Sequence, residues 1–366
     1  MNEKRRKHIF ITESERGLPY SKGLTASSLM STGLGPGAAY AVANKVEEEL
    51  RAAGSPYVTE DALRDLTVRV LRREAGDSYA QAFVKWQSVA ELDVPLIILL
   101  GGATGVGKST IATQLASRLG ITRVVSTDAV REVLRSALTE AMFPTLYASS
   151  FEADSAVRQP IPHSGDKLII GFREQAAAVA VGAQALIDRA IQEGTDMILE
   201  GAHLVPGFLQ SVESDKAIVV PLLITIDDED LHRSHFFRRG RDASGRGGDR
   251  YLNAFKKIRR LQKYMVSSAL MRGVPAIAHY DLDATLSEVI DHVINKALES
   301  VEKGIAVGGT DEKLIEKASE AVGRSKAAQV SDGNDGSSRR SATGNDDGSS
   351  RRSATGHEGG TREVVP

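Results

Sequence analysis

The stretch Pro95–Gly120, PLIILLGGATGVGKSTIATQLASRLG, carries the strongest structural pattern in the chain. It opens with an apolar run that is typical of a buried strand and continues through a glycine-rich segment. It ends in a segment whose Ile111, Leu115 and Leu119 share one helical face. The glycine-rich segment fits the pattern G-x-x-x-x-G-K-[S/T], and its place between a strand and a helix predicts a phosphate-binding loop, or P-loop.

Each part of this loop has a chemical reason. Glycines let the backbone curl so that successive N–H groups face a phosphate, and the start of the following helix adds partial positive charge. We expect Lys108 to reach the β- and γ-phosphates of ATP and the Ser109 hydroxyl to ligate Mg²⁺. The residues predicted to bind the nucleotide are Gly102, Ala103, Thr104, Gly105, Val106, Gly107, Lys108, Ser109 and Thr110.

Composition excludes several classes of function. The chain of 366 residues is long enough for two or three domains, and 41% hydrophobic with 26% charged residues is ordinary for a globular protein. A net charge of -2 gives no bulk attraction to nucleic acid or membrane, so we predict neither partner. The absence of cysteine excludes disulfides and thiol catalysis. No apolar run has the length of a membrane span or a signal peptide, so we expect a cytoplasmic protein.

Residues 1–92 are predicted to form a mostly helical domain. A short β-like segment, HIFIT, is followed by helical patterns in SKGLTASSLMSTGL, PGAAYAVANKVEEELRAAG and TEDALRDLTVRVLRREAG. Pro36 stands where a helix can begin and Gly54 where one can end, and Thr59 is a predicted N-cap.

Residues 93–303 are predicted to form an α/β domain. The apolar runs PLIILLG, RVVSTD, DMILEG, AIVVPLLITID and VPAIAHY alternate with segments of helical pattern. Strands that are apolar throughout and joined by helices indicate a doubly wound parallel sheet. Residues 304–366 hold a weak helical pattern and two copies of DGSSRRSATG, from Asp335 and from Asp347, which predict a disordered tail.

Two acidic residues follow predicted strands at the edge where a parallel sheet binds ligands. Asp128 comes after RVVST and is expected to orient or deprotonate an acceptor hydroxyl, unless it only caps the next helix. Arg131, one turn on, would hold an anionic acceptor or lie on a solvated face. Glu200 ends DMILE and is the predicted carboxylate partner of Mg²⁺, or an ordinary strand-end acid. His203 would contact substrate or be a loop histidine without that role.

The segment of about residues 232–250, HRSHFFRRGRDASGRGGDR, predicts a mobile lid. Arginines between flexible glycines can close on the charge that develops during phosphoryl transfer, and we assign this catalytic role to Arg238 and Arg239. The alternative is a basic solvated loop. The loop after VPAIAHY would pack on the nucleotide base, with His279 as its candidate residue.

Residues from about 8 to 300 resemble the 2-phosphoglycerate kinase family. The resemblance rests on LLGGATGVGKSTIATQLASRLGI, VVSTDAVREVLR and RYLNAFKKIRRLQKYM, and most specifically on SSFEA, GFREQ and EGAHLVPG. The N-terminal stretch PYSKGLTASSLMSTGL resembles an ATP-cone, a domain that commonly binds a regulatory nucleotide, with Lys22 as the candidate lysine.

The resemblance implies ATP- and Mg²⁺-dependent phosphorylation of 2-phosphoglycerate at its 3-hydroxyl, by direct in-line transfer, to give 2,3-bisphosphoglycerate and ADP. This acceptor carries a phosphate and a carboxylate, for which Arg131, Arg158, Arg173 and the lid arginines are the candidate partners. Three alternatives remain open at this stage. They are a P-loop kinase for another small hydroxy or sugar acid, a nucleotide-sensing regulator without kinase activity, and a nucleic-acid end kinase. The oligomeric state is open as well.

Overall fold

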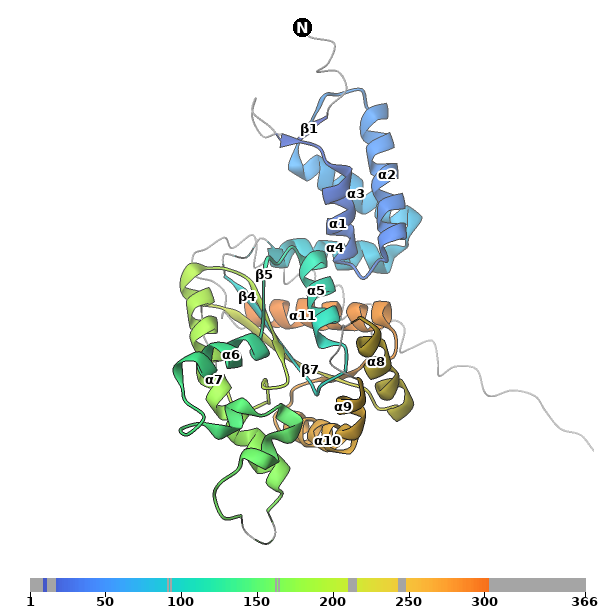
Figure 1. Ribbon diagram of the computed structural model, residues 1–366. Helices are drawn as coiled ribbons and strands as arrows, with labels where there is room; N and C mark the ends of the chain where they lie inside the picture. The colour runs from blue at the N-terminus through green and yellow to red at the C-terminus, as the bar shows by residue number, and fades with distance from the viewer. Residues whose placement is uncertain are drawn as a thin grey trace, which may run out of the picture. The chain divides into compact units, whose positions relative to one another are not determined.

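The computed structural model describes residues 9–11, 18–90, 92, 94–161, 163, 165–209, 216–242 and 248–302 (Figure 1). For residues 238–242, 248, 301 and 302 it describes the backbone alone. The predicted tail, 304–366, lies outside the described residues. Within the described ranges, no helix has the length and apolar character needed to cross a lipid bilayer.

A five-stranded parallel sheet forms the centre of the α/β part. Its strands are paired in the order β5-β6-β4-β7-β8. Their bounds are β4 Leu96–Gly101, β5 Arg123–Ser126, β6 Met197–Gly201, β7 Ile218–Thr225 and β8 Ala276–Ala278. The central strand β4 is buried along its whole length because it is paired on both sides and covered on both faces. The predicted strands and their parallel arrangement are therefore confirmed.

Alternate residues of β4 face two different apolar clusters, as the two-residue period of a strand requires. Ile98 and Leu100 pack with side chains of α5, α10 and α11, and Ile97 and Leu99 pack with α7. Helices thus cover both faces, which confirms the doubly wound fold (Figure 1). The helices are α5 Lys108–Leu119, α6 Thr127–Ala137, α7 Lys167–Glu193, α8 Glu229–Asp242, α9 Gly248–Asn253, α10 Phe255–Met271 and α11 Leu282–Glu302, with the short 3-10 helices η2 Pro144–Tyr147 and η3 Ser150–Ala156.

The N-terminal part contains helices α1 to α4 and a small sheet in the strand order β2-β1-β3. Thr59 caps α3 by accepting a hydrogen bond from the backbone N–H of Ala62, and Pro36 is the first residue of α2, as predicted. The bounds are β1 Phe10–Ile11, β2 Leu18–Pro19, α1 Lys22–Met30, α2 Pro36–Ala52, β3 Tyr57–Val58, α3 Glu60–Glu74 and α4 Asp77–Ala90.

Helix α4 belongs to two apolar clusters at once. Ala80 and Phe83 pack with α1, α2 and α3, whereas Trp86 and Val89 pack in the cluster that contains Ile98 of β4. One continuous helix therefore joins the two cores. The division of the chain near residue 92 stays a prediction, and so does the likeness of the N-terminal part to an ATP-cone.

Because α4 packs in both apolar clusters, we expect a substitution in the N-terminal cluster to destabilise the packing around Trp86 as well. Phe83→Ala should lower the free energy of unfolding by about 3–5 kcal/mol, because a buried aromatic ring is removed from a packed cluster. Trp86 is the single tryptophan of the chain, so urea unfolding can be followed by its fluorescence and by circular dichroism together. The unfolding midpoints measured by the two methods should fall by the same amount relative to the wild type. Val84→Ala, at a residue that is 40% exposed, is the control and should change little. A fluorescence transition that stays at its wild-type midpoint would contradict the shared helix.

Candidate active site

The P-loop lies between the end of β4 and the start of α5. Gly105 and Gly107 have φ angles of 88° and 90°, in the left-handed region that side chains with a Cβ atom avoid. Helix α5 begins at Lys108, so the helix N-terminus faces the loop. The predicted strand, loop and helix are confirmed at these positions, which gives the arrangement that binds phosphate groups in other proteins.

Three predicted residues meet at the start of α5. The Ser109 hydroxyl donates a hydrogen bond of 2.9 Å to Oε1 of Glu200, which lies on β6 and is buried. The Lys108 ammonium is also buried and donates to the backbone oxygen of Ala103 at 2.8 Å. The two oxygen groups suit Mg²⁺, which in phosphoryl-transfer sites takes one or two carboxylates along with water and phosphate oxygens. Within the described ranges there is no group of three His, Asp or Glu side chains that would make an all-protein metal site.

Asp128 lies at the same edge of the sheet. Ser126, two residues before it, ends β5 and pairs in register with Glu200 on β6. Ser126 also caps α6 by accepting a hydrogen bond from the Ala129 N–H at 3.1 Å, so the N-cap is Ser126 and not Asp128. The Asp128 side chain is 76% exposed, and its Oδ1 lies 4.0 Å from Nε of Arg131. Its carboxylate is therefore accessible to a bound acceptor.

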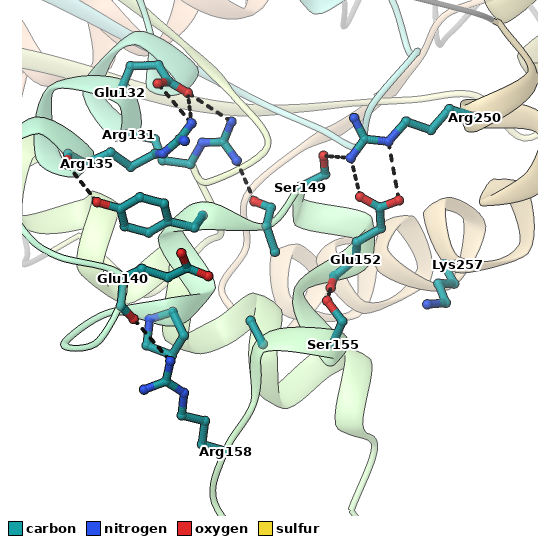
Figure 2. Close-up of a pocket in the computed structure, with 14 residues that line it drawn as sticks. Arg131, Glu132, Arg135, Glu140, Ser149, Glu152, Ser155, Arg158, Arg250 and Lys257 are labelled. Atoms are coloured by element: carbon teal, nitrogen blue, oxygen red, sulfur yellow. Dashed lines mark hydrogen bonds and ion pairs between the residues drawn. The ribbon is translucent and has the colours of Figure 1, made fainter.

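A cavity of about 720 Å³ opens beside α6 (Figure 2). Five cationic and three acidic side chains line it, so its lining is strongly polar with a net positive charge. The lining residues are Arg131, Glu132, Arg135, Glu140, Pro144, Tyr147, Ala148, Ser149, Glu152, Ser155, Ala156, Arg158, Arg250 and Lys257.

Helix α6 forms one wall of the cavity with Arg131, Glu132 and Arg135. Arg131 donates a hydrogen bond of 2.6 Å to the backbone oxygen of Ala148. Arg135, one turn further along α6, donates to both carboxylate oxygens of Glu132 at 2.7 and 3.0 Å. Its guanidinium lies 4.7 Å from the ring centroid of Tyr147. These contacts leave the two guanidinium groups side by side in Figure 2.

The opposite wall brings α9 and α10 against η3. Arg250 forms an ion pair with Glu152 and donates a hydrogen bond of 2.8 Å to Ser149 Oγ. Lys257 of α10 forms an ion pair of 2.8 Å with Asp154. The partners in these pairs are about a hundred residues apart in sequence. Ion pairs with exposed members contribute little stability in water, so an anionic ligand can compete for these cations.

A buried chain of hydrogen-bonded polar side chains supports the cavity wall that α6 forms. His203 is 2% exposed; its Nδ1 lies 2.9 Å from Thr127 Oγ1 and its Nε2 lies 3.2 Å from Gln175 Oε1. The amide nitrogen of Gln175 donates to the backbone oxygens of Thr145 and Ala148, so its Oε1 must accept from Nε2–H of the histidine. Burial lowers the pKa of His203 to about 4, which keeps the ring neutral.

The structure brings together some of the residues that were predicted to bind the acceptor substrate and separates others. Arg131 and Arg158 line the cavity. Arg173 is exposed on α7 and His203 is buried in the polar chain, and neither lines the cavity. The side chains of Arg238 and Arg239 fall outside the described part, so their predicted roles stay predictions.

Sequence reasoning missed Arg135 and Lys257. The spacing of Arg135 from Arg131, four residues on one helix, could have indicated it, because such residues share a helical face. No local signal pointed to Lys257, which reaches the cavity from a helix distant in sequence.

The sheet order, the P-loop and the polar cavity beside α6 are those of a P-loop nucleotide-binding protein of the kinase type. The sequence is 36% identical over 287 residues to a 2-phosphoglycerate kinase of Methanothermobacter thermautotrophicus, covering 78% of this chain and 94% of that protein. It is 38% identical to one of Thermococcus kodakarensis, covering 80% of this chain and 99% of that protein. For one of Pyrococcus horikoshii the identity is 39%, with 77% and 92% covered. The chain belongs to the 2-phosphoglycerate kinase family.

Other comparisons add less. No protein-family model matches the sequence. A solved structure of a shikimate kinase from Acinetobacter baumannii, with shikimate bound, is 17% identical with a TM-score of 0.33, covering 58% of this chain and 98% of that one. Similarity at that level carries no argument about the acceptor.

Two buried histidines predict a pH dependence of stability. Burial lowers the pKa of both His203 and His232 to about 4, below the value of about 6.5 expected in the unfolded chain. Between pH 6.5 and 4 the unfolded chain binds protons that the folded chain does not. The free energy of unfolding should therefore fall with falling pH in this range, by up to about 1.4 kcal/mol per pH unit for each histidine.

Urea unfolding at pH 7, 6 and 5 tests this expectation. His232→Gln, which keeps an N–H donor at the ε position but does not titrate, should flatten part of the dependence. His163→Gln, at an exposed position, is the control and should leave the dependence unchanged. Equal wild-type stability at pH 7 and 5 would show that these histidines are not held neutral by burial.

Proposed function

We propose that the chain transfers a phosphoryl group from ATP to the 3-hydroxyl of 2-phosphoglycerate, giving 2,3-bisphosphoglycerate and ADP. The observation that carries this proposal is the cation-lined cavity beside α6, the helix that follows β5, in a member of the 2-phosphoglycerate kinase family. ATP and phosphoglycerate are multiply charged and do not cross a bilayer unaided, so we place the reaction in the cytoplasm.

The charge of the cavity suits an acceptor with two anionic groups. Arg131 and Arg135 on one wall and Arg250 on the other present guanidinium groups, which bind phosphate and carboxylate oxygens in pairs. Five cations against three glutamates give the lining a net charge of +2, and the acceptor carries about three negative charges at neutral pH. An acceptor without its phosphate would leave part of this positive charge unpaired.

The donor side is supplied by the P-loop. The Lys108 ammonium would exchange its contact with the Ala103 oxygen for phosphate oxygens of ATP, as the P-loop lysine does in this class of site. Ser109 and Glu200 would hold Mg²⁺, which neutralises charge on the β- and γ-phosphates when it is bound. The burial of Lys108 and Glu200 strengthens their electrostatic effect, because charges interact more strongly away from bulk water.

We propose that Asp128 is the residue that orients and deprotonates the acceptor hydroxyl. Its exposed carboxylate lies on the first turn of α6, between the P-loop edge of the sheet and Arg131 in the cavity wall. It would accept the hydroxyl proton as the oxygen attacks, and transfer would be direct, without a phosphoenzyme. Arg238 and Arg239, near the end of α8, are proposed to stabilise the transferring group when the lid closes.

The N-terminal helices are proposed to bind a regulatory nucleotide. The candidate Lys22 forms an ion pair of 3.2 Å with Glu47, and its ammonium lies 5.2 Å from the ring centroid of Tyr40. A nucleotide phosphate would have to displace Glu47, while Tyr40, which is 48% exposed, offers a ring on which a base could stack.

An acceptor panel tests the proposed reaction. With Mg²⁺-ATP, we expect ADP release that depends on 2-phosphoglycerate, and a product with two phosphomonoester signals in its phosphorus NMR spectrum. Glycerate, gluconate and shikimate lack the phosphate and should give little turnover, and 3-phosphoglycerate has no free 3-hydroxyl. Turnover with one of these acceptors and none with 2-phosphoglycerate would show that the substrate is a different one. ATP binding without turnover on any acceptor would favour a nucleotide-sensing protein.

Asp128→Asn tests the role of that carboxylate. It should lower kcat by about 10²–10⁴-fold, the usual effect of losing a general base, and leave the dissociation constant for ATP within about twofold. Asp65→Asn, at an exposed position on α3, is the matched control and should behave as wild type. Single-turnover kinetics and nucleotide titration give the two quantities. Unchanged kcat, or a collapse of ATP affinity, would rule out the assignment.

A further inference from the structure

Helix α8 makes two hydrogen bonds to the backbone of the P-loop that the proposed chemistry does not use. Nε2 of His232 lies 2.9 Å from the backbone oxygen of Thr104, and Nδ1 of His235 lies 2.9 Å from the backbone oxygen of Gly105. A carbonyl oxygen only accepts, so both ring nitrogens must carry a proton. The two histidines therefore donate from opposite ring positions to two consecutive peptide groups of the loop.

The protonation state of His232 agrees with this geometry. Its Nδ1 is buried and has no hydrogen-bond partner among the residues that the structure describes. Burial lowers the pKa of this ring to about 4, so it carries a single proton near neutral pH, and the Thr104 oxygen holds that proton on Nε2. The donor is thus present at every pH at which the protein is expected to work.

Holding these two oxygens orients the following N–H groups. In a planar trans peptide the C=O and the next residue's N–H point in opposite directions. With the oxygens of Thr104 and Gly105 directed at α8, the N–H groups of Gly105 and Val106 point away from it. Both residues are buried, and neither N–H donates to an acceptor in the part of the chain that the structure describes. Buried N–H groups without a protein acceptor are suited to a ligand oxygen.

Tight packing keeps α8 at this distance. A Cβ atom on Gly105 would lie 2.3 Å from Cζ of Phe236, which is fully buried and stacks on His232 with ring centroids 5.3 Å apart. Tyr251 stacks on the other side of Phe236 at 5.2 Å. The helix therefore contacts the loop across bare backbone, with no room for a side chain at position 105.

We propose that His232 and His235 are positioning residues that hold two P-loop peptide groups so that the N–H groups of Gly105 and Val106 face the nucleotide phosphates. The proposal rests on the proposed binding of ATP at this loop. Because His232 and His235 lie in the first part of the predicted lid, about residues 232–250, the same bonds tie the start of that segment to the phosphate-binding backbone. Nucleotide affinity should thus depend on residues that do not touch the nucleotide themselves.

Matched substitutions test each bond. His232→Leu and His235→Leu remove the donors. His232→Gln keeps an amide donor near the ε position and His235→Asn keeps one near the δ position, whereas His232→Asn is too short to reach. His163→Leu, at an exposed position, is the control. The dissociation constant for MgADP is measured by titration calorimetry on the full chain, with KM for ATP and for 2-phosphoglycerate measured alongside.

Each leucine variant should bind MgADP roughly five- to tenfold more weakly, as expected when one neutral hydrogen bond is lost. KM for ATP should rise with it and KM for the acceptor should not. The glutamine and asparagine variants named for each position should recover most of the affinity. If a leucine variant does not fold, His232→Gln against His232→Asn gives the same comparison.

Wild-type affinity in the leucine variants would overturn the proposal. Equal weakening in His232→Gln and His232→Leu would also overturn it, because only ring packing would then matter. These outcomes leave the proposed reaction intact. Failure of the wild-type chain to bind MgADP would instead remove the proposed function and this inference with it.

Discussion

The rest of the structure depends on the pairing of β4 with a parallel neighbour on each side. This pairing fixes where β4 ends, and Gly101 at its last position is in register with Gly201 of β6. The pairing of β6 with its other neighbour, β5, places Ser126 beside Glu200. A slip of one residue would turn every side chain of the buried strand to the wrong face. The P-loop, the Glu200 carboxylate that we propose holds Mg²⁺, and the start of α6 thus reach one edge of the sheet because the registers of β6 with β4 and with β5 both hold.

Local patterns were enough to predict much of the fold and the P-loop. The apolar strands, the Thr59 cap and the glycine-rich loop each depend on residues close in sequence, and the structure confirms them. The cavity wall depends instead on tertiary contacts. Arg250 and Lys257 meet Glu152 and Asp154 across about a hundred residues, and no periodicity in the sequence encodes that meeting.

Histidines show the same limit on sequence reasoning. His203 follows a strand-end acid, which suggested a substrate contact, yet both of its ring nitrogens are engaged by Thr127 and Gln175 inside the protein. His232 and His235 stand in a segment noted for its arginines, and only the folded chain places them against the loop backbone. In both cases an imidazole ring inside the protein supports groups that would touch ligand, which is how a site is held within small tolerances by its surroundings.

A crystal structure of the chain with MgADP and 2-phosphoglycerate tests the central claim most directly. We expect the β-phosphate against the N–H groups of the P-loop and the anionic groups of the acceptor among Arg131, Arg135 and Arg250. The 3-hydroxyl should then face Asp128. An acceptor bound outside the cavity of Figure 2, or with its hydroxyl turned away from the P-loop, would contradict the site described here.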